Sequence, residues 1–175
     1  MSTLEVKAIQ APTGYKLAMP AGHILQTVST TKTDTFTTSS SSYVDITGMS
    51  VSITPSSTSS KIYVTANANV GNNSGSYASF VRLVRDSTAV AVGDSSGSRT
   101  VCSTYMSYDG NEYRISGAAS ILYLDSPNTT SATTYKLQMF SEGSSVTTFN
   151  RSGGDNDSGD RGRMASTITV MEIAG

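Results

Sequence analysis

The sequence predicts an all-β domain, an antiparallel β-sandwich of the jelly-roll type, and three observations lead to this fold class. Apolar and polar residues alternate along most of the chain, turn-forming residues separate these segments at short intervals, and no window has the apolar spacing of a helix. Only 14% of the residues are charged, which is less than in a typical globular domain. Ser and Thr take the place of charged residues, and Thr favours strands. About eight short strands at this spacing are typical of a sandwich or jelly roll.

The clearest strand is expected over residues 61–70, where Ile62 and Val64 share one phase and Tyr63 the other. Over residues 43–53 the apolar phase slips by one residue at Gly48, which is typical of a bulge or a tight bend. Further strands are expected over residues 79–85, 88–92, 101–107, 113–124, 134–141 and 166–173.

The last of these strands, residues 166–173, is apolar on both faces. Ile168 and Val170 lie on one face, and Met171 and Ile173 lie on the other. A strand of this kind is usually central in its sheet or lies at a subunit contact. Met171 and Ile173 are therefore candidates for a contact between subunits.

The first 19 residues differ from the rest, because two alternating segments flank a turn at residues 12–14. We expect residues 1–19 to form an N-terminal β arm ahead of a jelly-roll domain at 20–175. Extended termini are suited to adding a strand to a partner. The alternative is an ordinary first hairpin of the sandwich. The candidate anchoring residues of the arm are Leu4, Val6, Ile9, Tyr15 and Leu17.

Composition and charge argue against several classes of protein. The net charge is -1, and no basic stripe is present to neutralise phosphates, so nucleic-acid binding is not expected. No segment approaches the roughly 20 apolar residues of a membrane span. The N-terminus lacks the pattern of a signal peptide, so synthesis in a cytoplasm is expected. The single cysteine, Cys102, predicts a small buried or half-buried strand residue.

Catalysis is not expected, and no cofactor is implied. A nucleophilic triad would have to use His23, the only histidine, and nothing near it resembles a nucleophile elbow. Most acidic residues lie in turns, where they have conformational reasons to be. A small glycan-degrading enzyme is kept as a distant alternative, since it would need two carboxylates beside a cleft.

One acidic segment, residues 150–161, offers candidate ligands for calcium, which binds several oxygen atoms on a flexible loop. Its spacing does not match an EF-hand, and the alternative is a solvated loop in which arginines neutralise the acids. The candidate calcium ligands are Asp155, Asp157 and Asp160, and the neutralising residues are Arg151, Arg161 and Arg163.

Tyrosines in loop-rich segments suggest a surface for a glycan or receptor. A flat ring can stack on a sugar, and nearby amides can bind its hydroxyl groups. The alternative is that these tyrosines pack at strand ends or at a subunit axis. The candidates are Tyr77, Tyr105, Tyr108, Asn111 and Tyr113.

The run Pro20–Gln26 opens a series of short blocks that resembles a module of structural proteins of aquatic bacteriophages. Each block alone is unspecific, and their order carries the resemblance, which covers about residues 20–175. The other blocks are Ser42–Gly48, Val51–Pro55, Ser59–Ile62, Leu124–Pro127, Thr133–Gln138 and Ser166–Ile173.

The resemblance implies a β-sandwich similar to the trimeric jelly rolls of the complement C1q and tumour necrosis factor type, and it carries over no catalytic residue. We therefore expect a homotrimeric virion structural protein, a short fibre or fibre-tip module on the virion surface that attaches to the host. It would bind other virion proteins through the arm and a host glycan or receptor through its loops. The alternative is a capsid decoration or head-fibre protein. The chain lacks the shaft of a complete tail fibre.

Overall fold

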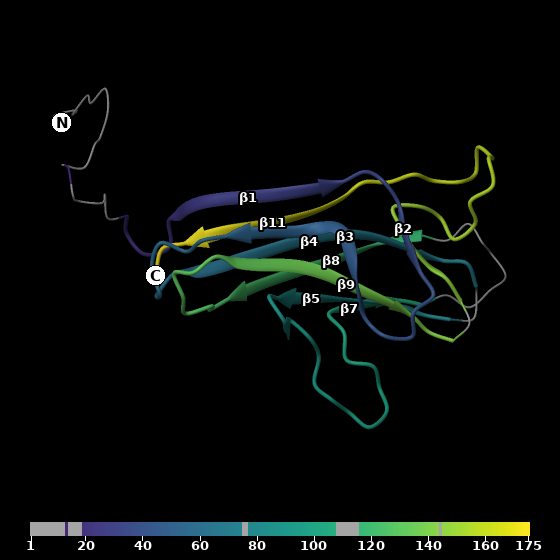
Figure 1. Ribbon diagram of the computed structural model, residues 1–175, viewed down its shortest axis with the longest axis horizontal. Coiled ribbons are helices and arrows are strands. Elements are labelled where there is room, and N and C mark those ends of the chain that lie inside the picture. Colours follow the sequence, from purple (N-terminus) through teal and green to yellow (C-terminus); the bar gives the residue numbers. More distant parts are fainter. Residues whose placement is uncertain (1–12, 14–18, 75–76, 108–115, 144) are drawn as a thin grey trace, which may run out of the picture.

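Two antiparallel sheets packed face to face make up the described part of the chain (Figure 1). The computed structural model describes residues 13, 19–74, 77–107, 116–143 and 145–175. Every regular element within these ranges is a strand. The predicted all-β sandwich is confirmed.

The first sheet is built around a long central strand, β4. Strand β8 pairs with β4 along residues 62–71 and so occupies one edge of it. Strands β11 and β10 follow one another along the other edge, at residues 61–67 and 70–72 of β4. Outside these two, β1 pairs with β11 and β2 pairs with β10. The strands of this sheet are β1 (Ile24–Lys32), β2 (Phe36–Thr38), β4 (Lys61–Asn72), β8 (Ser116–Asp125), β10 (Thr147–Phe149) and β11 (Ser166–Ile173).

The second sheet has the strand order β3-β9-β5-β6, and β7 also pairs with β5. The short strand β7 continues beyond β6 along the free edge of β5, because β6 pairs with residues 83–85 and β7 with residues 79–81. The strands are β3 (Val44–Ile53), β5 (Ser79–Arg85), β6 (Thr88–Val90), β7 (Thr104–Met106) and β9 (Thr133–Ser141).

The core lies between the sheets and consists of the inward phase of each strand. Ile62, Val64 and Val70 of β4 are fully buried, as are Leu83 of β5 and Leu137 of β9. Burial of such a side chain contributes roughly 1.5–3 kcal/mol relative to leaving it exposed. The predicted alternation over residues 61–70 is confirmed, because Ala66 and Ala68 are buried as well and the residues of the other phase are half-buried or exposed.

The predicted phase slip in β3 is a β-bulge. The register with β9 shifts between Asp45 and Ser50, and Gly48 has a φ of 82°. Ile46 and Met49, three positions apart, are both buried as a result. A left-handed conformation at Gly48 is what allows the strand to change phase there.

Three strands were not among the segments predicted by alternation, namely β1, β2 and β10. The inward positions of β1 include the polar Gln26, Thr30 and Lys32, so its apolar period is broken. In β10, Thr147 and Thr148 are both fully buried because their hydroxyl groups are hydrogen-bonded, which no period in the sequence reveals. The predicted strands at 88–92 and 101–107 are shorter in the structure, and residues 113–115 of the 113–124 strand lie outside the described residues.

A buried carboxylate fixes the turn between β3 and β4 to the end of the first sheet. Glu172 of β11 is fully buried and accepts hydrogen bonds from the Ser56 amide, the Ser56 and Ser60 hydroxyls and the Gln26 amide, at 2.6–2.7 Å. Burial alone would raise the pKa of Glu172, but the hydrogen bonds from Ser56, Gln26 and Ser60 outweigh it and lower the pKa to about 2. This side chain is therefore a charged carboxylate inside the fold.

A second buried acid joins the two sheets near the same end of β4. Asp125, at the end of β8, is 3% exposed. Its oxygens accept two 2.8 Å hydrogen bonds from Arg85 of β5 and one of 2.6 Å from the Tyr135 hydroxyl of β9. One carboxylate thus ties one strand of the first sheet to two strands of the second.

Candidate functional site

A row of aromatic rings crosses the outer face of the second sheet. Phe80 of β5 is paired in register with Tyr105 of β7 and with Phe140 of β9, so the three rings are at one level. The Phe80 ring stacks on Phe140 at 4.8 Å between centroids and on Tyr105 at 5.7 Å. Tyr43, just before β3, packs edge-on against Phe140 at 4.7 Å. Cross-strand pairing thus turns scattered sequence positions into one aromatic surface.

A row of polar side chains lies beside the rings and fixes them. The guanidinium carbon of Arg82 is 3.9 Å from the centre of the Tyr43 ring, and Arg82 Nε donates to Gln138 at 2.8 Å. Gln138 and Lys136 in turn donate to the two carboxylate oxygens of Asp45, at 2.7 and 2.8 Å. These hydrogen bonds, from Lys136 first, lower the pKa of Asp45, and burial raises the pKa of Tyr43.

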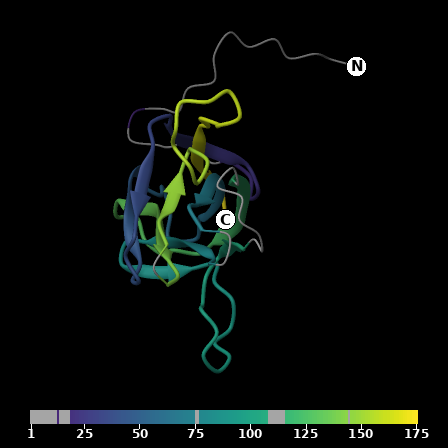
Figure 2. The same ribbon diagram turned by 90° about the vertical axis from the view of Figure 1, so that its right-hand side faces the viewer.

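The long loop between β6 and β7, residues 91–103, projects from the sandwich (Figures 1 and 2). Its return to the sheet is held by the Tyr43 hydroxyl, which donates to the Val101 carbonyl at 2.9 Å, and by the Ser103 amide, which donates to the Val81 carbonyl at 3.0 Å. The returning end of the loop therefore lies beside the aromatic row.

A groove of about 400 Å³ lies between this loop and the aromatic row, and we call it the Tyr105 groove. Tyr105 has the most exposed aromatic ring in the described chain at 60%. The acidic Glu142 and the basic Arg99, both exposed, lie in the same lining. The lining residues are Phe80, Ser98, Arg99, Thr100, Cys102, Tyr105 and Glu142.

The tyrosines predicted to bind a glycan or receptor have three outcomes. Tyr105 lines the groove. Tyr77 is 37% exposed and lies against Gly143, next to Glu142, so it is close to the groove without lining it. Tyr108, Asn111 and Tyr113 lie outside the described residues. Sequence reasoning missed Phe80, Phe140 and Tyr43, although the outward phase of residues 79–85 and 134–141 contained an aromatic residue in each case.

The outer face of the first sheet carries a separate apolar surface, which we call the Leu124 patch. Register brings its members together: Ile173 pairs with Ile24, and Tyr63 pairs with both Met171 and Leu124. Leu122 and Leu124 of β8 are 67% and 56% exposed. The patch consists of Ile24, Tyr63, Leu122, Leu124, Met171 and Ile173.

The structure places Met171 and Ile173 in the middle of this patch, half-buried between β1 and β4. The expectation that the last strand is central is therefore confirmed, and a subunit contact at these residues stays a prediction.

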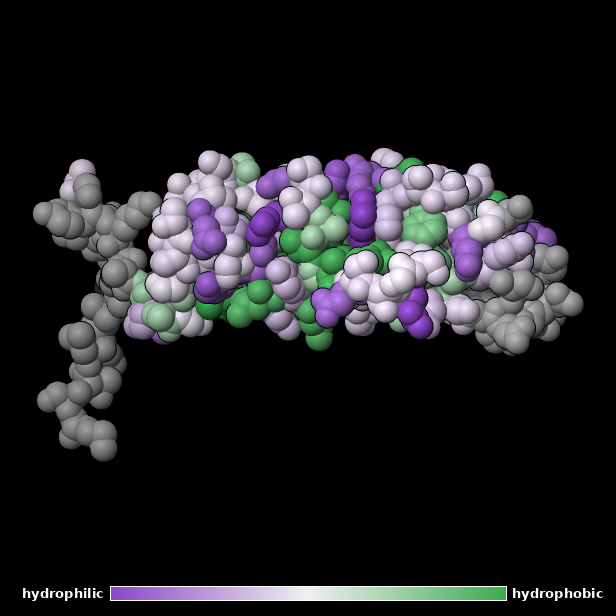
Figure 3. All heavy atoms as spheres, turned by 90° about the horizontal axis from the view of Figure 1, so that it is seen from below, coloured by the Kyte–Doolittle hydropathy of each residue, from purple (hydrophilic) through white to green (hydrophobic). Residues whose placement is uncertain are grey.

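Seen from the side of the β6–β7 loop, hydrophobic side chains are exposed between hydrophilic ones along the middle of the molecule (Figure 3).

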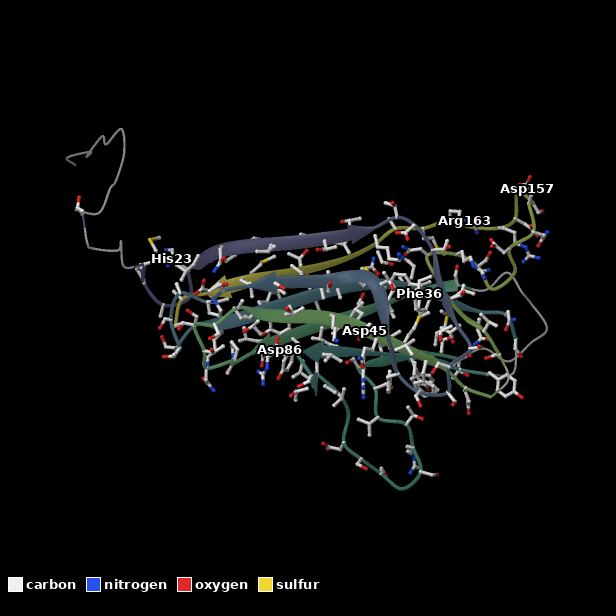
Figure 4. The ribbon with its side chains drawn as sticks, viewed as in Figure 1. His23, Phe36, Asp45, Asp86, Asp157 and Arg163 are labelled. Atoms are coloured by element: carbon white, nitrogen blue, oxygen red, sulfur yellow. The ribbon has the colours of Figure 1, made fainter. Side chains whose placement is uncertain are left out.

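The acidic loop is balanced by arginines. Asp155 is ion-paired with Arg163 and lies 3.8 Å from Arg151, and Asp160 lies 3.8 Å from Arg161. Asp157 is exposed near the tip of the same loop (Figure 4). Among the described residues, no three acidic, His or Cys side chains are grouped so as to hold a metal ion. The pairing matches the alternative of a neutralised loop, and calcium binding stays a prediction.

His23 lies at the end of the molecule opposite the acidic loop (Figure 4). Its Nδ1 is 3.0 Å from the Pro20 carbonyl, in an exposed turn before β1. Cys102 is half-buried as expected, but it lies just before β7 instead of within a strand, and burial raises the pKa of its thiol. Among the described residues, the hydrogen-bond partner of the His23 ring is a backbone carbonyl.

The predicted arm, with Leu4, Val6, Ile9, Tyr15 and Leu17, lies outside the described residues. Within the described ranges, no helix is long and apolar enough to cross a membrane. A comparison with protein-family models and with curated proteins finds no match to the chain.

Proposed function

We propose that this chain is a structural protein of a bacteriophage virion, a short homotrimeric fibre or fibre-tip module that attaches the particle to the host surface. The observation that carries the proposal is the Leu124 patch. It leaves Leu122 and Leu124 mostly exposed in the single chain. Contiguous apolar surface of this kind marks interaction sites in proteins, and closed symmetry between identical subunits is the commonest way to cover it.

The strand order supports the jelly-roll part of the proposal. If β1, β3, β4, β5, β6, β8, β9 and β11 are taken as the eight main strands, one sheet contains the first, eighth, third and sixth, and the other contains the second, seventh, fourth and fifth. Two Greek keys wound together produce this alternation between sheets. The order agrees with the resemblance to virion modules.

In the proposed assembly the two outer faces have different roles. The Leu124 patch on the first sheet meets neighbouring subunits, and the Tyr105 groove on the second sheet faces outward for recognition. The arm at residues 1–19 binds another virion protein. Recognition by loops on a rigid sandwich is a common arrangement, because loops tolerate variation while the sheets keep their positions.

The assembly is tested by light scattering on the full chain. We expect a mass three times 18.3 kDa. The variant Leu122→Asp/Leu124→Asp is expected to be monomeric, since it places charge in the apolar contact. The matched control is Ser120→Asp, an exposed residue of the same strand and face outside the patch, and it is expected to remain trimeric. A monomeric wild type would contradict the trimer.

Location is tested separately by immunogold labelling of virions with an antibody against the purified protein. Label at a tail or fibre tip is the expected result. Label over the shell would replace the fibre module by the alternative, a capsid decoration or head-fibre protein. Virions without label would contradict a virion role altogether.

A further inference from the structure

We propose that the Tyr105 groove binds a neutral sugar, a hexose or N-acetylhexosamine residue of a surface polysaccharide. The inference rests on the proposed attachment function and gives it a ligand class and a place in the fold. It is carried by the coincidence of an exposed ring, a carboxylate, a guanidinium and hydroxyl groups around one hollow of about 400 Å³.

The ring of Tyr105 provides the platform. One face of this ring is stacked against Phe80, at 5.7 Å between centroids and 22° between planes. The side chain nevertheless remains 60% exposed, so its other face is open to a ligand. A pyranose has one face of C–H groups that packs on an aromatic ring, and the tyrosine hydroxyl at the ring edge stays available for hydrogen bonding.

The platform is formed before any ligand arrives. Phe80 is stacked on Phe140 with only 7° between their planes, and Tyr43 closes the row edge-on. Tyr43 is itself held by Arg82 above its ring and by its hydrogen bond to Val101. A ring supported in this way loses little freedom on binding, which favours affinity for a small ligand.

Glu142 and Arg99 supply the polar contacts. The Glu142 Oε2 accepts the Ala78 amide at 3.1 Å, and within the described chain its Oε1 is available to accept sugar hydroxyls. Among the described residues, Arg99 donates from Nη1 to Ser96 of its own loop, at 3.2–3.4 Å, and the remaining guanidinium N–H groups can donate to ring or hydroxyl oxygens. One acid and one base leave the described part of the lining without net charge, which favours a neutral sugar over a uronic or sialic acid.

Binding without cleavage follows from the same lining. Hydrolysis of a glycosidic bond needs two carboxyl groups about 5–9.5 Å apart. Among the described lining residues, the groove contains one, Glu142. A single carboxylate in the described lining fits a proposal in which the ligand is bound and released unchanged.

The test uses the full chain and an array of oligosaccharides of hexoses and N-acetylhexosamines, followed by titration calorimetry with the best ligand. We expect Tyr105→Ala to weaken binding by about ten-fold or more and Tyr105→Phe, which keeps the ring, by less than about three-fold. Glu142→Gln is expected to weaken binding by about ten-fold. The matched control is Asp94→Asn, an exposed acid of the β6–β7 loop that does not line the groove, and it is expected to bind as the wild type does.

Three outcomes overturn the inference. The wild-type protein binds no oligosaccharide of the array, or it binds only acidic sugars. The third is that a folded Tyr105→Ala variant binds with wild-type affinity. Circular dichroism of each variant shows whether it is folded. These failures are distinct from failure of the proposed function, because a trimer that labels virions but binds no neutral sugar would leave the structural role in place.

Discussion

Glu172 shows how one side chain controls the stability of this domain as a function of pH. We expect Glu172→Gln to lower the free energy of unfolding at pH 7 by about 2 kcal/mol, because an amide cannot accept all the hydrogen bonds that Ser56, Ser60 and Gln26 donate. Urea unfolding measures the difference. Glu142→Gln is the control, since that carboxylate is exposed, and its effect is expected to stay within about 0.5 kcal/mol.

The same residue predicts a pH dependence with a definite sign. The pKa of Glu172 in the folded chain is about 2, below its ordinary value of 4.5. Its contribution is therefore complete above pH 4.5 and is lost as the pH falls through 2. Unfolding curves at pH 7, 4 and 2.5 should show the wild type losing more stability than Glu172→Gln. Parallel losses in the two proteins would contradict the assigned charge.

Among the acidic residues with a described ion pair, Asp125 is expected to be the one whose substitution lowers the stability of the fold most. In Asp125→Asn the amide group would confront the Arg85 or Tyr135 donors and leave the Arg85 charge uncompensated. Because the Arg85 side chain is 26% exposed, we expect a loss of about 2–3 kcal/mol, below the usual cost of breaking a fully buried pair. Thermal unfolding tests this. Asp45→Asn, at the exposed pair with Lys136, should cost about 0.5 kcal/mol; equal losses at both sites would contradict the account.

At the scale of the element, the bulge in β3 allows a prediction of how stability depends on backbone conformation at Gly48. Gly48 has a φ of 82°, and a Cβ there would meet nothing closer than 3.7 Å, from Lys32. Gly48→Ala should therefore destabilise the fold by about 1–2 kcal/mol through strain, since its Cβ has room. Gly48→Asn, which tolerates this conformation better, should cost less. The melting temperatures of the two variants give the comparison, and equal values would rule out strain as the cause.

Strands with one apolar and one polar face could be predicted from the sequence. Strands that bury hydrogen-bonded hydroxyl groups could not. The period of two identified the inward residues of β4 and its extent over 61–70, and the strand continues to Asn72. Strand β10 buries Thr147 and Thr148 together, because the distant Ser79 hydroxyl bonds to Thr147 and the Arg151 carbonyl, three residues further on, accepts from Thr148. The Ser79 partner is set by tertiary structure and leaves no local pattern.

The site was predictable only in part for the same reason. Tyr105 was identified from its loop-rich surroundings. Phe80 and Phe140 are 60 residues apart in the chain, and only the pairing of β5 with β9 brings their rings to 4.8 Å. Periodicity gives the face on which each ring lies, but register between distant strands decides which rings meet.

At the scale of the whole molecule, the nature of the proposed subunit contact predicts how the assembly responds to salt. None of the six members of the Leu124 patch is charged. Screening at high ionic strength should therefore leave the contact intact. We expect the mass in solution to be unchanged between about 0.05 and 1 M NaCl, roughly the span over which the Debye length falls from above 10 to 3 Å. A mass that falls with added salt would indicate an ionic contact instead.

The ends of the described chain lie side by side, since the Gly22 amide donates to the Ala174 carbonyl at 2.7 Å and the Ala174 amide to the His23 carbonyl at 2.8 Å. The aromatic row lies toward the other end of the strands, at the start of β5 and the end of β9. A particle tethered through residues 1–19 and held by a ligand at the groove would thus be pulled along the strand axis. The ladder between β1 and β11 would then be loaded in shear, with its hydrogen bonds resisting together and not opening one after another, so the geometry suits a link that must bear mechanical tension.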